Sequence, residues 1–277
     1  MQYSLEKIVD FVLTPKAIRD ENRHRKEVVR GVTDIVGRAW TRVDELIQSP
    51  VWEYDDEEHK KVRTRWFAHG LDEGLLATTY LVVHGLPRDV APQNHEDVAF
   101  GFIIHDIGKI ESVDPAVWYK HFSEITAEDK KGMQAHVDPY GVKMIHKLRK
   151  NGVVIPPISE EILLFHHERI NGSGKPYELE GHDISFWARL AAGVDSVISR
   201  AENHSYQFPN QSGRFSLRSA SEHVTAEAGV KFDAEIMENL NNLLQYHTIY
   251  FTDVLKATDG WYRSTSHAQM ILSDHSL

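Results

Sequence analysis

The sequence predicts an all-α protein built as a bundle of helices. Apolar residues recur at helical spacing over most of the chain, and strand signals are few and short. The sequence contains no internal repeat and no glycine fingerprint of a doubly wound α/β domain. With 277 residues, of which 41% are hydrophobic and 26% charged, the chain suits one large globular domain with an extension.

The first predicted element is a long charged helix. Thr14-Pro15 pairs a capping residue with a proline suited to the first helical position, and the helix runs to about Gln48. The acidic stretch from Glu53 to Glu58 then breaks the chain. Residues 1–60 are therefore expected to form a helical N-terminal extension that acts as a cap or as a dimerisation element.

The second helix carries His69 and ends at Gly85-Leu86-Pro87. The apolar stretch 98–104 then leads to His105-Asp106. Further helices are predicted from Thr126 with its capping-box partner Asp129 to about Gly152, and over 158–169, 184–200, 219–230 and 233–255. A loop signal, Asn171-Gly172-Ser173-Gly174, follows the predicted helix over 158–169. We expect one helical domain over residues 61–255 and a C-terminal tail over 256–277.

Composition excludes several classes of protein. No apolar run approaches the length of a membrane span, and the N-terminus lacks the order of a signal peptide. The absence of cysteine excludes disulfides, thiolate metal sites and cysteine nucleophiles, so the cytoplasm is the simplest compartment. A formal net charge of -10 argues against binding of polymeric nucleic acid.

Histidines and aspartates form an ordered series along the predicted bundle. Consecutive members are separated by about one helix plus one connection, so successive helices can project them into one central pocket. The series consists of His69, His105, Asp106, His136, His166, His167 and Asp195. Because neighbouring residues do not share a helix face, the pairs His105-Asp106 and His166-His167 are expected at helix ends.

The donor atoms of this series predict a binuclear metal centre. Nitrogen- and oxygen-rich ligation without thiolates suits iron, manganese, zinc, cobalt or nickel better than magnesium or calcium. A carboxylate such as Asp106 can bridge two cations. Two divalent ions, two aspartates and a hydroxide leave the pocket slightly positive, which suits an anionic phosphodiester. A single histidine is more often a surface or structural residue, so the hypothesis depends on the whole series.

These residues resemble the HD superfamily of metal-dependent phosphohydrolases and, within it, the HD-GYP family. The resemblance covers roughly residues 62–250. Its motifs are His105-Asp106-Ile107-Gly108-Lys109, His166-His167-Glu168-Arg169 with the following glycine loop, and Val194-Asp195. The first motif alone indicates only the superfamily, and the paired histidines, glycine loop and later aspartate narrow it to HD-GYP.

The resemblance implies a phosphodiesterase of bacterial signalling that hydrolyses a cyclic dinucleotide, chiefly cyclic di-GMP, to a linear dinucleotide or mononucleotides. One metal is then held by His69, His105, Asp106 and Asp195, and the other by His136, His166, His167 and the bridging Asp106. The two ions, with iron or manganese favoured, share a hydroxide that attacks the phosphorus. Lys109, one turn beyond Asp106, is expected to neutralise phosphate charge.

The chain departs from the family pattern in the loop that names it. Gly174-Lys175-Pro176 replaces Gly-Tyr-Pro, Tyr177 stands one position late, and Asn171 replaces an aspartate. Gly174 and Lys175 are candidate substrate-binding residues, although Lys175 fits a surface loop residue equally well. Arg200 is the one arginine close after the last aspartate and is the remaining candidate.

Arg65 occupies a position where some family members carry a glutamate for a third metal, so a two-metal site is expected. Three functions stay open at this point. The first is a cyclic dinucleotide phosphodiesterase, acting on cyclic di-GMP or on 3',3'-cyclic GMP-AMP. The second is a phosphohydrolase of another nucleotide or phosphate ester, and the third is a catalytically silent module that binds a cyclic dinucleotide or a protein.

Overall fold

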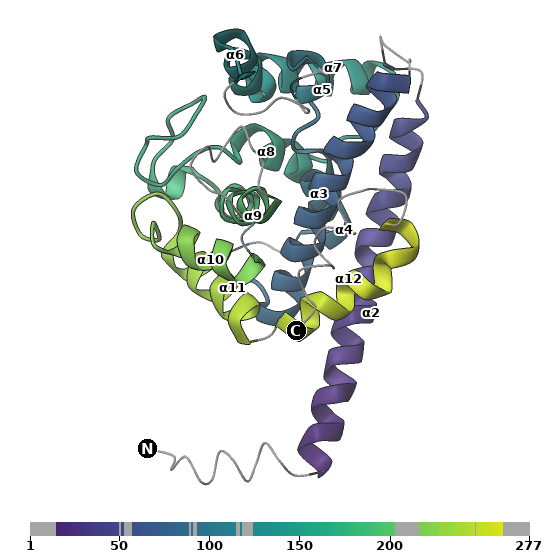
Figure 1. Cartoon of the computed structure of the whole chain (residues 1–277), viewed down its shortest axis with the longest axis vertical. Helices are drawn as coiled ribbons and strands as arrows, with labels where there is room; N and C mark the ends of the chain where they lie inside the picture. The colour runs from purple at the N-terminus through teal and green to yellow at the C-terminus, as the bar shows by residue number, and fades with distance from the viewer. Residues whose placement is uncertain are drawn as a thin grey trace.

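A computed structural model describes residues 15–262 except 50, 53–56, 89, 91–92, 115–116, 118–123, 203–215 and 247. All regular structure within these residues is helical, which confirms the predicted all-α fold (Figure 1). Two isolated β-bridges, Asn171 with Glu180 and Ala228 with Phe232, are the extended pairings in this part of the chain. Among the described residues no helix is both long enough and apolar enough to cross a membrane.

Three N-terminal helices pack along one another: α2 (Pro15–Ile47), α3 (Glu57–His84) and α4 (His95–Ile104). Figure 1 shows α2 lying beside α3, with its first turns extending beyond the rest of the molecule. Helices α3 and α4 approach closely where α3 carries Gly70, because a Cβ there would lie 2.3 Å from the backbone oxygen of Ile103. This contact brings His69 of α3 next to the C-terminal end of α4.

The N-terminal helix is joined to the core rather than separate from it. Val28, Val32 and Val36 of α2 are buried in the same apolar cluster as the rest of the bundle. Among the α2 side chains described from residue 21 onward, no apolar residue is exposed. These observations agree with a cap, whereas a role of residues 1–60 in dimerisation stays a prediction.

The remaining helices include α9, which lies near the middle of the body in Figure 1 and packs against α3, α8, α10 and α11. They are α5 (Lys109–Ser112), α6 (Ala127–Ala135), α7 (Val142–Lys150), α8 (Pro157–Phe165), α9 (Phe186–Glu202), α10 (Leu217–Thr225), α11 (Ala234–Tyr246) and α12 (Thr248–Tyr262). Helix α12 packs against α2 and α3, and the pair Arg25–Asp253 at 3.1 Å joins it to α2. It continues into the segment predicted as a C-terminal tail from residue 256.

Two predicted helices are divided in the structure. The helix expected from Thr126 to Gly152 is interrupted at Asp138-Pro139, where Asp138 has extended dihedrals (φ -133°, ψ 123°) because a following proline disfavours the helical region. The helix expected over 233–255 is described as two helices, α11, which ends at Tyr246, and α12, which begins at Thr248, and residue 247 lies outside the described residues. The helix predicted to reach Arg169 ends at Phe165. The break was predicted from Glu53 to Glu58; residues 53–56 lie outside the described residues, whereas Glu57 and Glu58 begin α3.

Candidate metal centre

The seven predicted ligands come together from the interiors of two helices and the ends of three others. His69 lies within α3 and Asp195 within α9. The C-caps of α4, α6 and α8 are His105, His136 and His166, and Asp106 and His167 each follow directly. Both adjacent pairs therefore lie at helix ends, which confirms the expectation drawn from their spacing.

The three C-cap histidines are oriented in the same way. In each ring Nδ1 faces the carbonyl oxygen three residues earlier: Phe102 for His105 at 2.7 Å, Leu163 for His166 at 2.9 Å, and Met133 for His136. A carbonyl at Nδ1 requires that this nitrogen carry the hydrogen, so Nε2 presents its lone pair to the pocket. Such outer contacts are typical of metal-binding imidazoles.

Gly108 permits the turn after α4 to approach the end of α6. A Cβ at Gly108 would lie 1.9 Å from the carbonyl oxygen of His136. Its φ of -65° is ordinary, so the glycine is required by this close approach rather than by a left-handed helix end.

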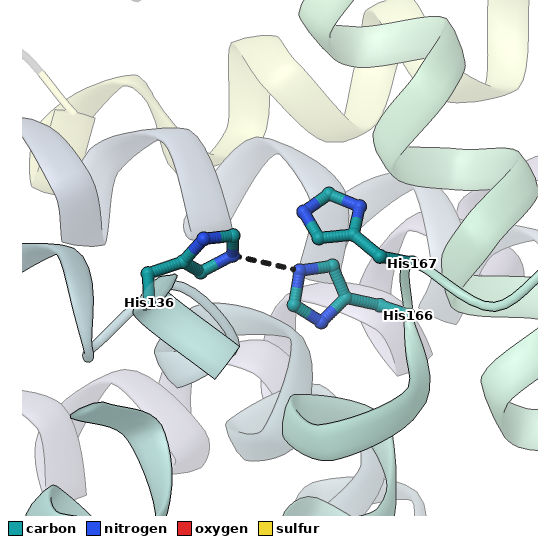
Figure 2. A group of neighbouring side chains, drawn as sticks. All are labelled: His136, His166 and His167. Carbon is teal, nitrogen blue, oxygen red and sulfur yellow. Dashed lines mark hydrogen bonds between the residues drawn. The ribbon is translucent and has the colours of Figure 1, made fainter. Parts of the chain in front are cut away.

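Two groups of potential ligands share no residue, and a third group, His105, Asp106 and His166, overlaps both. His136, His166 and His167 form one, and their rings converge in Figure 2. The other consists of His69, His105 and Asp195, the first-metal set predicted from the sequence apart from Asp106, together with the unpredicted Glu73. Within each group the potential ligand atoms lie within 4.8 Å of one another.

Asp106 lies between the two groups. Its Oδ1 is 3.1 Å from Nε2 of His136 and 3.8 Å from Nε2 of His166. Its Oδ2 is 3.5 Å from Nε2 of His105 and 3.9 Å from Nε2 of His69. The two oxygens of one carboxylate thus face two different sets of imidazole nitrogens, as a bridging ligand requires.

Several buried polar atoms of the centre need a partner that the described part of the protein does not supply. Within the described residues, Nε2 of His105 and Oδ1 of Asp106 are buried without a hydrogen-bond partner. The Nε2 atoms of His136 and His166 are 3.4 Å apart (Figure 2). Because both rings carry their hydrogen on Nδ1, two lone pairs face each other there. A cation between the rings relieves this repulsion, so these residues fit a bound metal.

The electrostatics of the centre agree with that fit. Burial holds the pKa of His166 and His167 well below the usual range, so both rings are neutral and available as ligands. Burial opposes ionisation of Asp106, but His105, Lys109 and His136 outweigh it and hold the pKa of this carboxyl well below its usual value. Neutral imidazoles and ionised aspartates are the forms that bind metal ions.

Sequence reasoning assigned no role to three residues of the site. Glu73, one turn after His69, is 1% exposed, and burial raises the pKa of its carboxyl well above the usual value. Ser199 donates to Oδ1 of Asp195 at 2.9 Å. The buried Glu168 accepts hydrogen bonds from backbone nitrogens of the glycine loop. For Glu73 the available signal was its i+4 spacing from His69, which places both on one face of α3.

Lys109 is buried beside Asp106 rather than exposed in an open cleft. Its side chain is 11% exposed, its ammonium contacts Oδ2 of Asp106, and it lies 4.7 Å from the centroid of the Trp66 ring. From this position Lys109 adds positive charge behind Asp106.

The glycine loop is attached to the centre through Glu168. Oε1 of Glu168 accepts from the backbone nitrogen of Tyr177 at 2.8 Å, and Oε2 accepts from that of Leu179 at 2.9 Å. Gly174 packs directly on this residue, since a Cβ would lie 2.4 Å from its Cα. Asn171 accepts a hydrogen bond from the hydroxyl of Ser173 at 2.7 Å, so it supplies the acceptor that an aspartate would.

The side chains of the altered loop residues face solvent. Lys175 pairs with Glu178, and the Lys175 side chain is 70% exposed. Tyr177 is 41% exposed and donates to Asp138 at 3.2 Å.

Two hollows open beside the centre, and His167 and Arg169 line both. The first, of about 300 Å³, is bounded by the end of α6 and the glycine loop, including Gly174 and Lys175. The second, of about 270 Å³, is bounded by α9 and the α10–α11 connection, including Asp195 and Arg200. All three candidate substrate-binding residues other than Lys109 therefore border a hollow next to His167.

Comparison with known proteins identifies relatives of this region. The sequence profile of the HD domain matches residues 71–236. The chain is 28% identical over 137 residues to the 3'3'-cGAMP-specific phosphodiesterase 2 of Vibrio cholerae, covering 50% of this chain and 24% of that protein. It is 27% identical over 142 residues to the cyclic di-GMP phosphodiesterase of Thermotoga maritima, covering 51% of this chain and 36% of that protein. The matched segment thus spans about a quarter of the first relative and little more than a third of the second.

Proposed function

The chain belongs to the HD-domain family and is HD-GYP-like, and from that premise we propose that it is a metal-dependent phosphodiesterase of cyclic dinucleotides. The observation that carries this proposal is Asp106, whose two oxygens face two sets of imidazole nitrogens. His69, His105 and Asp195 would hold one ion with Oδ2 of Asp106. His136, His166 and His167 would hold the other with Oδ1.

Two divalent ions bound there would supply acidity that deprotonates water near neutral pH and positive charge that stabilises a phosphodiester under attack. The protein's own residues provide the remaining functions. The helix-end carbonyls orient the rings, and Lys109 adds charge behind Asp106. The burial of the centre strengthens each of these electrostatic interactions.

The two hollows indicate how the substrate would lie. A cyclic dinucleotide carries a nucleoside on either side of each phosphodiester, and the hollows lie on either side of His167 and Arg169. With the phosphodiester at the centre, one nucleoside would enter the hollow at Gly174 and Lys175, and the other the hollow at Arg200. Arg169, whose guanidinium is 4.8 Å from the ring centroid of Phe232, would provide positive charge between them.

Cyclic di-GMP remains the expected substrate, with 3',3'-cyclic GMP-AMP as the alternative. The altered loop and the relative specific for 3'3'-cGAMP both favour testing the two side by side. Iron or manganese is the expected metal pair, because neutral imidazoles and carboxylates suit these ions.

The test combines metal analysis with turnover. Protein purified without oxygen is analysed for transition metals and is then given cyclic di-GMP, 3',3'-cyclic GMP-AMP, cyclic di-AMP and bis(p-nitrophenyl) phosphate. We expect two tightly bound ions per chain and turnover of at least one cyclic dinucleotide. Less than one ion per chain would refute the binuclear centre, and two ions without any turnover would favour the silent binding module.

A further inference from the structure

Glu73 is a buried acid in the wall of the proposed metal centre. It lies one helical turn after His69 on α3, and both side chains are 1% exposed. A buried carboxylate needs a cation or several hydrogen-bond donors. Apart from Nε2 of His69, Oε1 of Glu73 has no hydrogen-bond partner among the described residues. The position therefore requires a further explanation.

The atom that Glu73 approaches distinguishes between two roles. A carboxylate that orients a metal-binding histidine from outside contacts the ring nitrogen pointing away from the metal. Oε1 of Glu73 instead lies 3.0 Å from Nε2 of His69. That same Nε2 lies 3.9 Å from Oδ2 of Asp106 and 3.9 Å from Oδ1 of Asp195. Oε1 thus shares the space that the inward-facing ligand atoms surround.

The second oxygen of Glu73 supports the neighbouring imidazole. Oε2 lies 3.4 Å from Nδ1 of His105, the nitrogen that also faces the carbonyl of Phe102. One oxygen of Glu73 is therefore directed toward the ligand atoms, and the other toward the outer side of His105. A single side chain can then bind an ion and steady the ring beside it.

We propose that Glu73 is a ligand of the ion held by His69, His105 and Asp195. This inference rests on the proposed binuclear centre, and it makes the ligands of the two ion positions unequal in charge. One position then has two carboxylates of its own besides Asp106, whereas the other has three imidazoles and Asp106. Carboxylate oxygens attract divalent cations more strongly than neutral nitrogens do, and they favour Mn²⁺.

The two proposed ion positions also differ in burial, and the position that includes Glu73 is the more buried one. His69, Glu73 and His105 are each 1% exposed, and Asp195 is 8% exposed. In the three-histidine group the side chain of His167 is 33% exposed, and it lines both hollows. The Glu73 position therefore retains its ion, and the three-histidine position exchanges its ion and faces the substrate. Two divalent ions, two aspartates and a hydroxide would leave the centre slightly positive, and the negative charge of Glu73 cancels that excess. Arg169 and Arg200 must therefore attract the phosphates.

The test is a Mn²⁺ titration of metal-free full-length protein, followed by the electron paramagnetic resonance signal of free Mn²⁺. The wild type should show a tight and a weaker site. Glu73→Gln should weaken the tight site by more than about 100-fold, beyond the roughly 10- to 100-fold cost of losing an outer contact. Ser199→Ala removes the hydrogen-bond donor to Asp195, so it measures how much Mn²⁺ affinity is lost when only a contact to a ligand is removed. Glu238→Gln, on the exposed face of α11, makes the same charge change away from the centre.

A loss in Glu73→Gln no larger than that in Ser199→Ala would overturn the proposal. If Glu73→Gln does not fold by circular dichroism, Glu73→Asp replaces it, since it keeps the charge and withdraws the oxygens. A tight site in Glu73→Asp weakened less than in Ser199→Ala would likewise overturn the assignment. A wild-type chain that binds no Mn²⁺ refutes the proposed centre itself, whereas two wild-type sites that both persist unchanged in Glu73→Gln refute the role of Glu73 alone.

Discussion

Five of the seven predicted ligands are at most 2% exposed, whereas in the adjoining glycine loop Lys175 and Tyr177 face solvent. The ligands lie on helices and helix ends, and backbone carbonyls orient three of them. The loop is attached to the centre through Glu168 and through a hydrogen bond from the Lys175 backbone nitrogen to the carbonyl oxygen of His167. We therefore expect that exposed loop side chains can change without moving the metal ligands. Substrate preference can then vary while the metal-dependent chemistry stays the same.

The largest effect is expected from Asp106→Ala, which removes the one carboxylate shared by the two ligand groups. Both ions should be lost, and turnover should fall at least about a thousandfold, since metal ions supply several kcal/mol of charge stabilisation. Metal analysis by mass spectrometry together with turnover measures the result. Retention of both ions in this variant would show that the bridging assignment is wrong.

Gly108→Ala tests the close packing of the centre. The added Cβ would lie 1.9 Å from the carbonyl oxygen of His136, so the turn has to move. Overpacking of this kind costs about 1–3 kcal/mol, which lowers the melting temperature by roughly 2–10 °C. Thermal unfolding of the metal-free protein measures the loss.

The matched control is Gly31→Ala in α2, where a Cβ meets nothing within 4 Å. Alanine is the better helix former by about 0.5–1 kcal/mol, so this variant should be unchanged or slightly more stable. Equal melting temperatures for the two variants would mean that the turn at Gly108 is not tightly constrained.

Glu168→Gln tests whether the glycine loop and the metal centre act independently. One backbone donor of the loop would face an amide group instead of a carboxylate oxygen, and a hydrogen bond to a charged group contributes about 1.5–3 kcal/mol. We expect KM to rise about tenfold or more, with both ions retained. Loss of metal together with the rise in KM would show that loop and centre are not independent.

The smallest effect is expected from Lys175→Ala, because Lys175 is an exposed partner of Glu178 and surface pairs contribute about 0–1 kcal/mol. KM should change less than about fivefold and kcat should not change, as in the control Lys256→Ala on α12. A rise in KM above about tenfold, reduced at high salt, would identify Lys175 as a phosphate contact.

The spacing of histidines and aspartates was sufficient to predict which side chains meet. Consecutive members are separated by about one helix plus one connection, so their order along the chain indicates that they meet in one pocket. Glu73 had only its i+4 spacing from His69 as a signal, because acidic residues within helices usually face solvent and its burial depends on how α4 and α9 cover α3. Helix boundaries were harder to predict: Pro139 could have indicated the break after Asp138, but no glycine or proline marks the separation of α11 from α12.

The carbonyl contacts of His105, His136 and His166 also have an entropic consequence. Each imidazole completes the end of its own helix, so its rotation is already restricted before any ion arrives. An incoming cation then meets rings in their final orientation, and few rotamers remain to be lost on binding. Withdrawal of electron density from Nε2 would in turn make each Nδ1–H a better donor. Metal loading would therefore stiffen three helix termini at once, and slower amide hydrogen exchange at the ends of α4, α6 and α8 would report it.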